Sequence, residues 1–194
     1  MQSMLLVDQN RCVGCGICIT VCPEAITLEK EKGFAKILIE KLECIRKAML
    51  ACPQKAIKEI KDKLIIAIGT DDHKTIKSND HVGQSVYFQI FEYSEGNLVL
   101  KETRENFKYK EDETRTHGDP GKAKATASVL TGVDVLVGKI MGPNIVRLKN
   151  QFVCAIIREK DIAAAMDIIK ANICVIVQEK NKRAGKEKSG IILK

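Results

Sequence analysis

The sequence predicts two domains, a small cysteine-rich α+β domain followed by a larger α/β domain with a mixed sheet. Six of the eight cysteines fall within the first 52 of the 194 residues. Beyond residue 61 the pattern changes to longer alternating segments with strand and helix signals. The hydrophobic content of 45% is enough for packed cores. We therefore expect domains at residues 1–60 and 61–178, followed by a basic tail at 179–194.

The first domain is expected to contain short elements. β-forming residues and helix-forming residues predict strands at 4–7, 25–28, 35–39 and 56–60, and helices at 16–21 and 43–51. Gly33 marks the turn between the two central strands. The stretches CPEAITL at Cys22 and CPQKAIKEI at Cys52 occupy matching places. This match indicates an internal repeat of two related halves.

The second domain is expected to begin with a buried strand and a hairpin and to continue with alternating helices and strands. The expected strands are 64–68, 85–93, 98–104, 133–137 and 153–157, and the expected helices are 122–130, 144–150 and 162–171. Asp161 is the expected N-cap of that last helix. Residues 105–122 are polar and include glycine and proline, so they predict a mobile loop. This order predicts a mixed sheet covered by helices.

Composition and charge narrow the functional classes. The N-terminal residues lack the pattern of a secretory signal, and no apolar run approaches a membrane span, so we expect a cytoplasmic protein without a membrane partner. Residues 179–194 hold six basic and two acidic residues, which is more than half of the net charge of +7. A charged tail, instead of a charged folded face, argues against nucleic acid as the partner. The tail is either solvated or a docking arm for an acidic partner or an anionic cluster.

The stretch CVGCGICITVCP, residues 12–23, has cysteines at C-x2-C-x2-C-x3-C-P spacing. This spacing is typical of bacterial iron–sulfur proteins, in which the first three cysteines bind one [4Fe–4S] cluster and the fourth serves a second cluster. Gly14 and Gly16 allow the backbone to approach a cluster closely. The sequence therefore predicts an iron–sulfur site and not a disulfide framework.

The second half of the repeat determines how many clusters are expected. Aligned on Cys52-Pro53, a complete motif needs cysteines at positions 42, 45 and 48, where the chain has Leu42, Ile45 and Ala48. The three cysteines that would bind only a second cluster are thus absent, whereas Cys52 is present. The predicted ligand set for one [4Fe–4S] cluster is Cys12, Cys15, Cys18 and Cys52. Cys22 has no cluster to serve.

With this ligand pattern, residues 1–60 resemble single-cluster [4Fe–4S] ferredoxins of the α+β ferredoxin-like fold. In several of these proteins the cysteine after the triplet faces another cysteine eight residues before the distant ligand. Cys22 and Cys44 occupy those positions. The resemblance implies that they can form a disulfide; two free buried thiols are the alternative in a reducing cytosol.

Several segments of residues 63–178 resemble the dinitrogenase iron–molybdenum cofactor biosynthesis family, of the NifX and NifB C-terminal type. The segments are KLIIAIGTDD at 63–72, HVGQ at 81–84, YFQIF at 87–91, REN at 104–106, HG at 117–118 and GKIMGP at 138–143. The resemblance implies an RNase-H-like fold and a role in binding or carrying metal–sulfur clusters. The chain departs from the family at Val82, where an aromatic residue is common, and in having one histidine in the loop.

The residues assigned to a guest-cluster site are His81, His117, Met141 and Gly142. His81 and His117 are either loop ligands or solvated side chains. The turn at 138–143 either presents backbone N–H groups to an anionic cluster or is a plain connection between a strand and a helix. Cys154 and Cys174 lie in apolar runs and are expected to be buried hydrophobic residues.

The sequence favours one function over two others. The leading one is a non-catalytic protein that transfers electrons through the first domain and binds or carries an iron–sulfur or heterometal cluster in the second. Its partner would be a redox protein or cluster-assembly machinery. The alternative is a simple electron carrier whose second domain docks to a redox enzyme. A nuclease would need converging carboxylates, and the spacing of Asp71, Asp72 and Asp134 does not indicate them.

Overall fold

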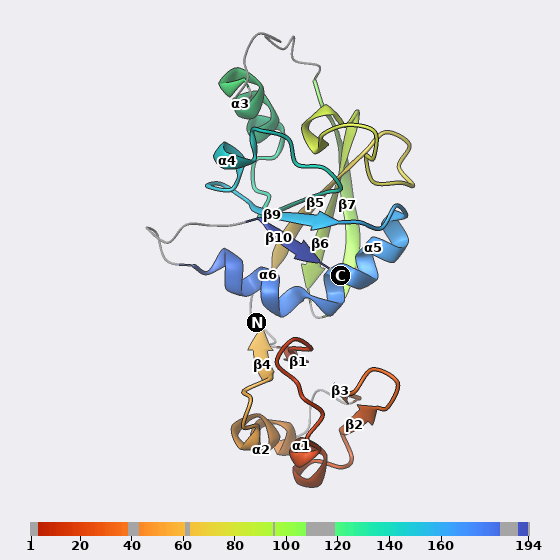
Figure 1. Ribbon diagram of the computed structural model, residues 1–194, viewed down its shortest axis with the longest axis vertical. Coiled ribbons are helices and arrows are strands. Elements are labelled where there is room, and N and C mark those ends of the chain that lie inside the picture. Colours follow the sequence, from red (N-terminus) through yellow and green to blue (C-terminus); the bar gives the residue numbers. More distant parts are fainter. Residues whose placement is uncertain are drawn as a thin grey trace. The chain divides into compact units, whose positions relative to one another are not determined.

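The computed structural model describes residues 4–38, 43–60, 63–94, 96–107, 119–182 and 190–193. The chain forms two units, residues 1–62 and residues 63–194, and Figure 1 shows the elements of each. No helix in the described ranges is long and apolar enough to cross a membrane.

The first unit contains two small antiparallel sheets and two helices. Its elements are β1 Met4–Val7, α1 Ile17–Val21, β2 Ile26–Glu29, β3 Phe34–Ile37, α2 Glu43–Ala51 and β4 Ile57–Ile60. Strand β1 pairs with β4 and strand β2 pairs with β3. Gly33 has a φ of 73° at the turn between β2 and β3, a conformation that glycine adopts without steric penalty. The structure thus confirms the elements expected in this part of the chain.

A small aliphatic core holds the first unit together. The core packs residues from both halves of the repeat, among them Leu5, Ala25, Ile26, Ala35, Ile45, Ala48 and Ile57. Ile45 and Ala48 are fully buried. Two of the positions at which a second cluster would need cysteines are therefore filled by apolar side chains of α2, and Leu42 lies outside the described residues.

The second unit is built on a six-stranded mixed sheet with the strand order β10-β9-β8-β5-β6-β7. Its elements are β5 Leu64–Thr70, the short 3₁₀ helix η1 Val82–Gln84, β6 Tyr87–Ser94, β7 Asn97–Glu105, α3 Pro120–Val129, β8 Val135–Gly138, α4 Ile145–Leu148, β9 Val153–Ile157, α5 Ile162–Ala171, α6 Ile173–Lys180 and β10 Ile191–Leu193. The strands β6 and β7 continue antiparallel from β5, whereas β8, β9 and β10 lie parallel on its other side. The expected mixed α/β sheet is confirmed.

Helices cover both faces of this sheet (Figure 1). One face carries the row Ala67, Leu136 and Cys154, which packs against apolar residues of α3 and α4. Side chains alternate along a strand, so the neighbouring row Ile66, Val135 and Val153 points to the opposite face. Helices α5 and α6 lie on that side, where the carboxylate of Asp161 caps α5 by accepting N–H bonds from Ala163 and Ala164.

The C-terminal part of the chain differs from the sequence-based expectation in two places. Helix α5 is not the last helix, because α6 follows directly after Asn172 and buries Ile173, Ile176 and Val177 at helical spacing. The tail is not solvated to its end, because β10 pairs with β9 and Leu193 is buried. Residues 183–189 of the tail and most of the expected loop at 105–122 lie outside the described residues; α3 begins at Pro120.

Candidate metal centre

Two glycines in left-handed conformations shape the loop between β1 and α1. Gly14 has a φ of 66° and Gly16 a φ of 79°, which residues with a side chain rarely adopt. Gly14 also lies against the hairpin turn, since a Cβ atom there would be 2.4 Å from the carbonyl oxygen of Gly33. The loop can therefore lie flat on the β2–β3 turn and direct its cysteines to one side.

The structure brings the four predicted cluster cysteines together around one cavity. Cys12, Cys15 and Cys18 reach it from the loop and the first turn of α1, and Cys52 reaches it from the residue after α2. Apolar side chains, including Val7 and Ile17, complete the lining. The cavity thus offers thiols and an apolar wall, which are the features that a [4Fe–4S] cluster requires.

Burial and the other three cysteines both affect the protonation of Cys18. Burial raises the pKa of the Cys18 thiol above its usual value, and the neighbouring Cys12, Cys52 and Cys15 raise it further. Four thiolates without a cation would repel one another, so the arrangement favours a bound cationic centre that replaces the protons.

Backbone amides also point at the sulfurs. The N–H of Ala35 donates to Sγ of Cys12 and the N–H of Ala56 donates to Sγ of Cys52, each at 3.3 Å. Such N–H groups stabilise thiolates and tune the potential of an iron–sulfur cluster. The donor set and its hydrogen bonds therefore fit the group that the cysteine spacing predicts.

The four cysteines surround a cavity and are not gathered around one point. Among the described residues, no group of three or more His, Cys, Asp or Glu side chains lies close enough to hold one metal ion. A [4Fe–4S] cluster needs no such group, because its four cysteines bind around a larger body. The cavity between the four thiols agrees with this requirement.

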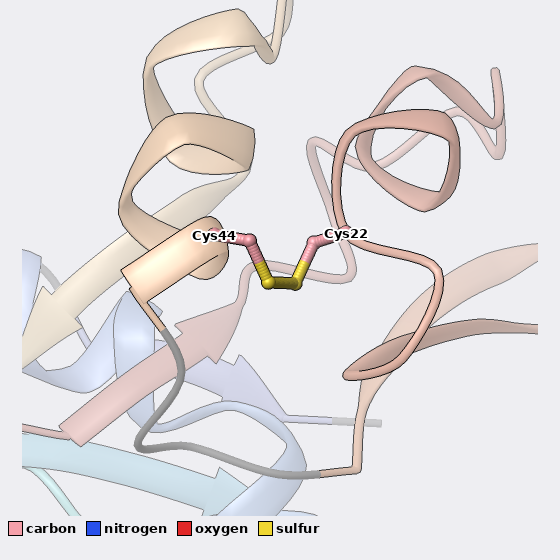
Figure 2. The surroundings of a disulfide bond; sticks show 2 residues. All are labelled: Cys22 and Cys44. Carbon is pink, nitrogen blue, oxygen red and sulfur yellow. A yellow bond between two sulfur atoms is a disulfide. The ribbon is translucent and has the colours of Figure 1, made fainter.

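Cys22 and Cys44 lie apart from this cavity, and the structure joins them by a disulfide (Figure 2). Their Cα atoms are 5.2 Å apart, and the bond links the end of α1 to the start of α2. Cys22 is fully buried in the core of the first unit. The bond therefore ties the two halves of the repeat together.

In the second unit the structure brings His81 and Gly142 together. A Cβ atom on Gly142 would lie 2.7 Å from the imidazole ring of His81, so the ring rests directly on the glycine backbone. The His81 side chain is about half exposed, and its Nδ1 atom is 3.2 Å from Oδ1 of Asp80. Met141 is buried in the core beneath the turn. His117 lies outside the described residues.

Val82 seats the His81 segment on the sheet. Its N–H donates to the carbonyl oxygen of Ile140, and its side chain lies against the backbone of Gly69 and Gly138. These glycines lie at the carboxyl ends of β5 and β8, where the strand order reverses. In α/β sheets this is the usual place for a ligand site.

Sequence reasoning did not assign a role to Asn106 or Ser85. The side-chain amide of Asn106 donates to the carbonyl oxygens of Gly83 and Ser85 and so holds the His81 segment in place. Within the described ranges, Ser85 Oγ is buried without a hydrogen-bond partner. The sequence signal for Asn106 was its position in the REN segment, directly after a strand. A buried serine such as Ser85 has no recognisable signal in the sequence.

The carboxylates considered for a nuclease do not converge. Asp71 and Asp72 follow the carboxyl end of β5, whereas Asp134 accepts the N–H of Ile65 at the other end of that strand.

Cys154 and Cys174 are buried as expected, and burial raises the pKa of Cys154 to about 11.

Comparison with known proteins gives a family match for each unit. Residues 5–58 match the family described as 4Fe-4S single cluster domain. The ferredoxin of Thermococcus litoralis is 40% identical over 53 residues, which are 26% of this chain and 88% of that protein. The ferredoxin of Moorella thermoacetica is 33% identical over 60 residues, covering 28% of this chain and 94% of that protein. The first unit is thus a ferredoxin-type domain for a [4Fe–4S] cluster.

The crystal structure of ferredoxin I from Desulfovibrio africanus matches 31% of this chain and all of that chain, with 25% identity and a TM-score of 0.29. Residues 62–182 match the family described as dinitrogenase iron-molybdenum cofactor. That match spans more than half of the 194 residues, so the chain belongs to the dinitrogenase iron–molybdenum cofactor family.

Proposed function

We propose that this protein is a non-catalytic carrier in the assembly or trafficking of metal–sulfur clusters. The first unit passes single electrons, and the second unit binds a guest iron–sulfur or heterometal cluster. One observation supports the proposal most directly. The same chain contains a cavity lined by four cysteines and a domain that matches the cofactor family. A [4Fe–4S] cluster, when bound, supplies one-electron redox chemistry.

The proposed ligands of that cluster are Cys12, Cys15, Cys18 and Cys52. Their loop excludes water on one side with apolar side chains, and the amides of Ala35 and Ala56 support the sulfur atoms. Cys15 is exposed, which places one edge of the site near the surface of the unit. A site at the surface suits electron exchange with a partner protein.

The proposed guest site is formed by His81 and the backbone at Met141 and Gly142; His117, also expected from the sequence, lies outside the described residues. The contact of His81 with Gly142 and the position of the segment at the carboxyl ends of β5 and β8 support it. Because the units share one chain, electrons can reach a guest at a high effective concentration. We further propose an RNase-H-like topology for this unit, a cytoplasmic location, and partners among redox or cluster-assembly proteins.

Anaerobic analysis of iron, sulfide and trace metals in the full chain and its variants tests the proposal. The first site should contribute about four irons and four sulfides. Cys52→Ala should lose them, while Cys154→Ala, a buried cysteine outside the site, should keep them. A second metal component, loaded by offering the protein a cluster donor, should survive Cys52→Ala and be lost in His81→Ala.

His73→Ala is the matched control for His81→Ala, because His73 is also an exposed histidine of the second unit and lies against Tyr87, with ring centroids 4.4 Å apart. If the full chain takes up only the first cluster under every loading condition, the carrier role is wrong. The second unit would then be a docking module of a simple electron carrier.

A further inference from the structure

A buried carboxylate lies just before the cluster loop. Asp8 is 3% exposed and is the one buried charged residue among the described residues of the first unit. Its Oδ2 atom is 3.0 Å from Nζ of Lys58, and its Oδ1 atom accepts the N–H of Asn10 at 3.2 Å. Lys58 is on β4, fifty residues along the chain, and its side chain is 23% exposed. The ion pair is therefore largely shielded from solvent.

The backbone of Asp8 joins the two segments that provide the cluster cysteines. Its carbonyl oxygen accepts the N–H groups of Arg11 and Cys12, at 3.1 and 2.9 Å. Its N–H donates to the carbonyl oxygen of Ala56 at 2.7 Å, and the N–H of Ala56 donates to Sγ of Cys52. One residue thus connects the beginning of the cysteine loop with the segment of the distant ligand.

Charged groups beside an iron–sulfur site change how easily its cluster is reduced. Reduction adds a negative charge, which a nearby carboxylate disfavours and a nearby ammonium group favours. Shielding from solvent strengthens both effects relative to those of exposed charges. Net charge around an iron–sulfur cluster is one of the factors that set its reduction potential.

We propose that Asp8 is a positioning residue of the cluster site and that the Asp8–Lys58 ion pair sets the reduction potential of the bound cluster. The side chain of Asp8 helps to hold the two cysteine segments in register, because it joins the N–H of Asn10 in the cysteine loop to Lys58 on β4. Its carboxylate lowers the potential, and Lys58 offsets that effect from the neighbouring strand.

The test is the reduction potential of the full-length, cluster-loaded protein, measured at one pH and one ionic strength. Asp8→Asn keeps the size and the acceptor oxygen but removes the charge, so it should raise the potential. Lys58→Met removes the cation and leaves the carboxylate buried, so it should lower the potential. The double variant should return close to the wild-type value.

Two exposed residues of the same unit give matched controls. Glu24→Gln makes the same charge change as Asp8→Asn, and Lys47→Met makes the same change as Lys58→Met, but both side chains are in solvent. Their shifts should be smaller than those of the buried pair. Release of iron to a chelator measures positioning separately. Asp8→Ala should release iron faster than Asp8→Asn.

Opposite shifts at the two partners are the decisive result. A merely structural role would loosen the site in both variants and move the potential in the same direction. Shifts in the same direction, or shifts no larger than those of the controls, would overturn the assignment of the potential to this pair. If Asp8→Asn does not retain a cluster, Lys58→Met against Lys47→Met still decides the charge effect. Equal iron release from Asp8→Ala and wild type would overturn the positioning role.

Discussion

Gly14 and Gly16 share a left-handed backbone in the cluster loop but differ in their surroundings. An added Cβ atom at Gly14 would meet the carbonyl oxygen of Gly33 at 2.4 Å, whereas at Gly16 nothing lies within 4 Å. Comparing a substitution at Gly14 with the same substitution at Gly16 therefore separates the effect of steric contact from that of backbone strain. Cysteine spacing alone shows that both glycines suit a tight loop, but it does not show which one touches the hairpin.

We predict that Gly14→Ala destabilises the cluster site more than Gly16→Ala. Both variants carry the left-handed strain of a residue with a side chain, roughly 1–2 kcal/mol. Gly14→Ala must also displace a backbone carbonyl group, which cannot rotate away as a flexible side chain can. The measurement is the thermal midpoint of the loss of cluster absorbance, with Gly16→Ala as the matched control. Equal midpoints for the two variants would contradict the contact with Gly33.

Asp72 organises the loop after β5. Its carboxylate accepts the N–H groups of Thr75 and Lys74 at 2.7 and 2.9 Å, and the hydroxyl of Thr75 at 2.8 Å. These hydrogen bonds, those from the backbone first, hold the pKa of Asp72 far below its usual range. The charged form is thus favoured in the folded loop.

A depressed folded-state pKa means that Asp72 stabilises the fold above its unfolded pKa of about 4 and loses this effect as the pH falls further. We predict that Asp72→Asn is less stable than wild type at pH 7 and that the difference shrinks below about pH 4. All three tyrosines lie in the second unit and there is no tryptophan, so urea unfolding followed by tyrosine fluorescence reports on this unit in the full chain.

The exposed Asp167→Asn on α5 makes the same chemical change away from the loop and serves as the control. A stability difference between Asp72→Asn and wild type that stays constant from pH 7 to pH 3 would show that Asp72 acts without its charge.

At the scale of elements, the end of the chain contributes a strand to the sheet. Strand β10 lies parallel to β9, with Leu193 opposite Ile157, and covers an edge that would otherwise expose unpaired backbone groups. Leu193 is 2% exposed, whereas its neighbour Ile192 is 56% exposed. The alternation shows that one face of this short strand is part of the core.

We predict that Leu193→Ala lowers the free energy of unfolding of the second unit by about 2–4 kcal/mol, because a buried leucine leaves a cavity. Ile192→Ala is the matched control and should change it by less than about 0.5 kcal/mol. Urea unfolding followed by tyrosine fluorescence gives both values. A Leu193→Ala variant as stable as wild type would mean that β10 is not held in the sheet in solution.

Most elements were predictable because their signals are local. The run at 64–68 is continuously apolar, and residues 43–51 are good helix formers, so both elements appear in the structure as expected. Strand β10 and helix α6 were not predicted, for two different reasons. Three apolar residues after a basic segment give too short a signal for a strand. The apolar run of α6 has no cap that distinguishes it from a continuation of α5.

At the scale of the whole molecule, one polypeptide contains domains of two different families. The ferredoxin-type domain and the cofactor-family domain are matched at residues 5–58 and 62–182, so only a few residues separate them in the sequence. If electrons pass from the first unit to a guest in the second, this short connection makes the transfer intramolecular.

We predict that a chain loaded at both sites reduces its guest at a rate independent of protein concentration. A mixture of full-length Cys52→Ala, loaded with guest only, and full-length His81→Ala, loaded with the first cluster only, should react at a rate proportional to concentration. Stopped-flow spectroscopy after rapid reduction of the first cluster measures both. A doubly loaded chain whose rate also rises with concentration would show transfer between molecules and would contradict the intramolecular route.

The sequence by itself predicted which four cysteines bind the cluster, and the structure places all four around one cavity. The spacing of Cys12, Cys15 and Cys18 is a local property, because a short loop must bring its thiols around one body whatever the rest of the chain does. The same holds for the missing ligands at 42, 45 and 48, and for the mixed α/β character of the second unit, which follows from the order of its elements.

Only the tertiary structure decided which distant residues support those sites. Asp8 and Lys58 are fifty residues apart, Val82 rests on glycines of two different strands, and Leu193 completes a sheet that begins at Leu64. None of these contacts has a periodic signal in a single sequence. They depend on which segments exclude water together, and that is a property of the packed chain.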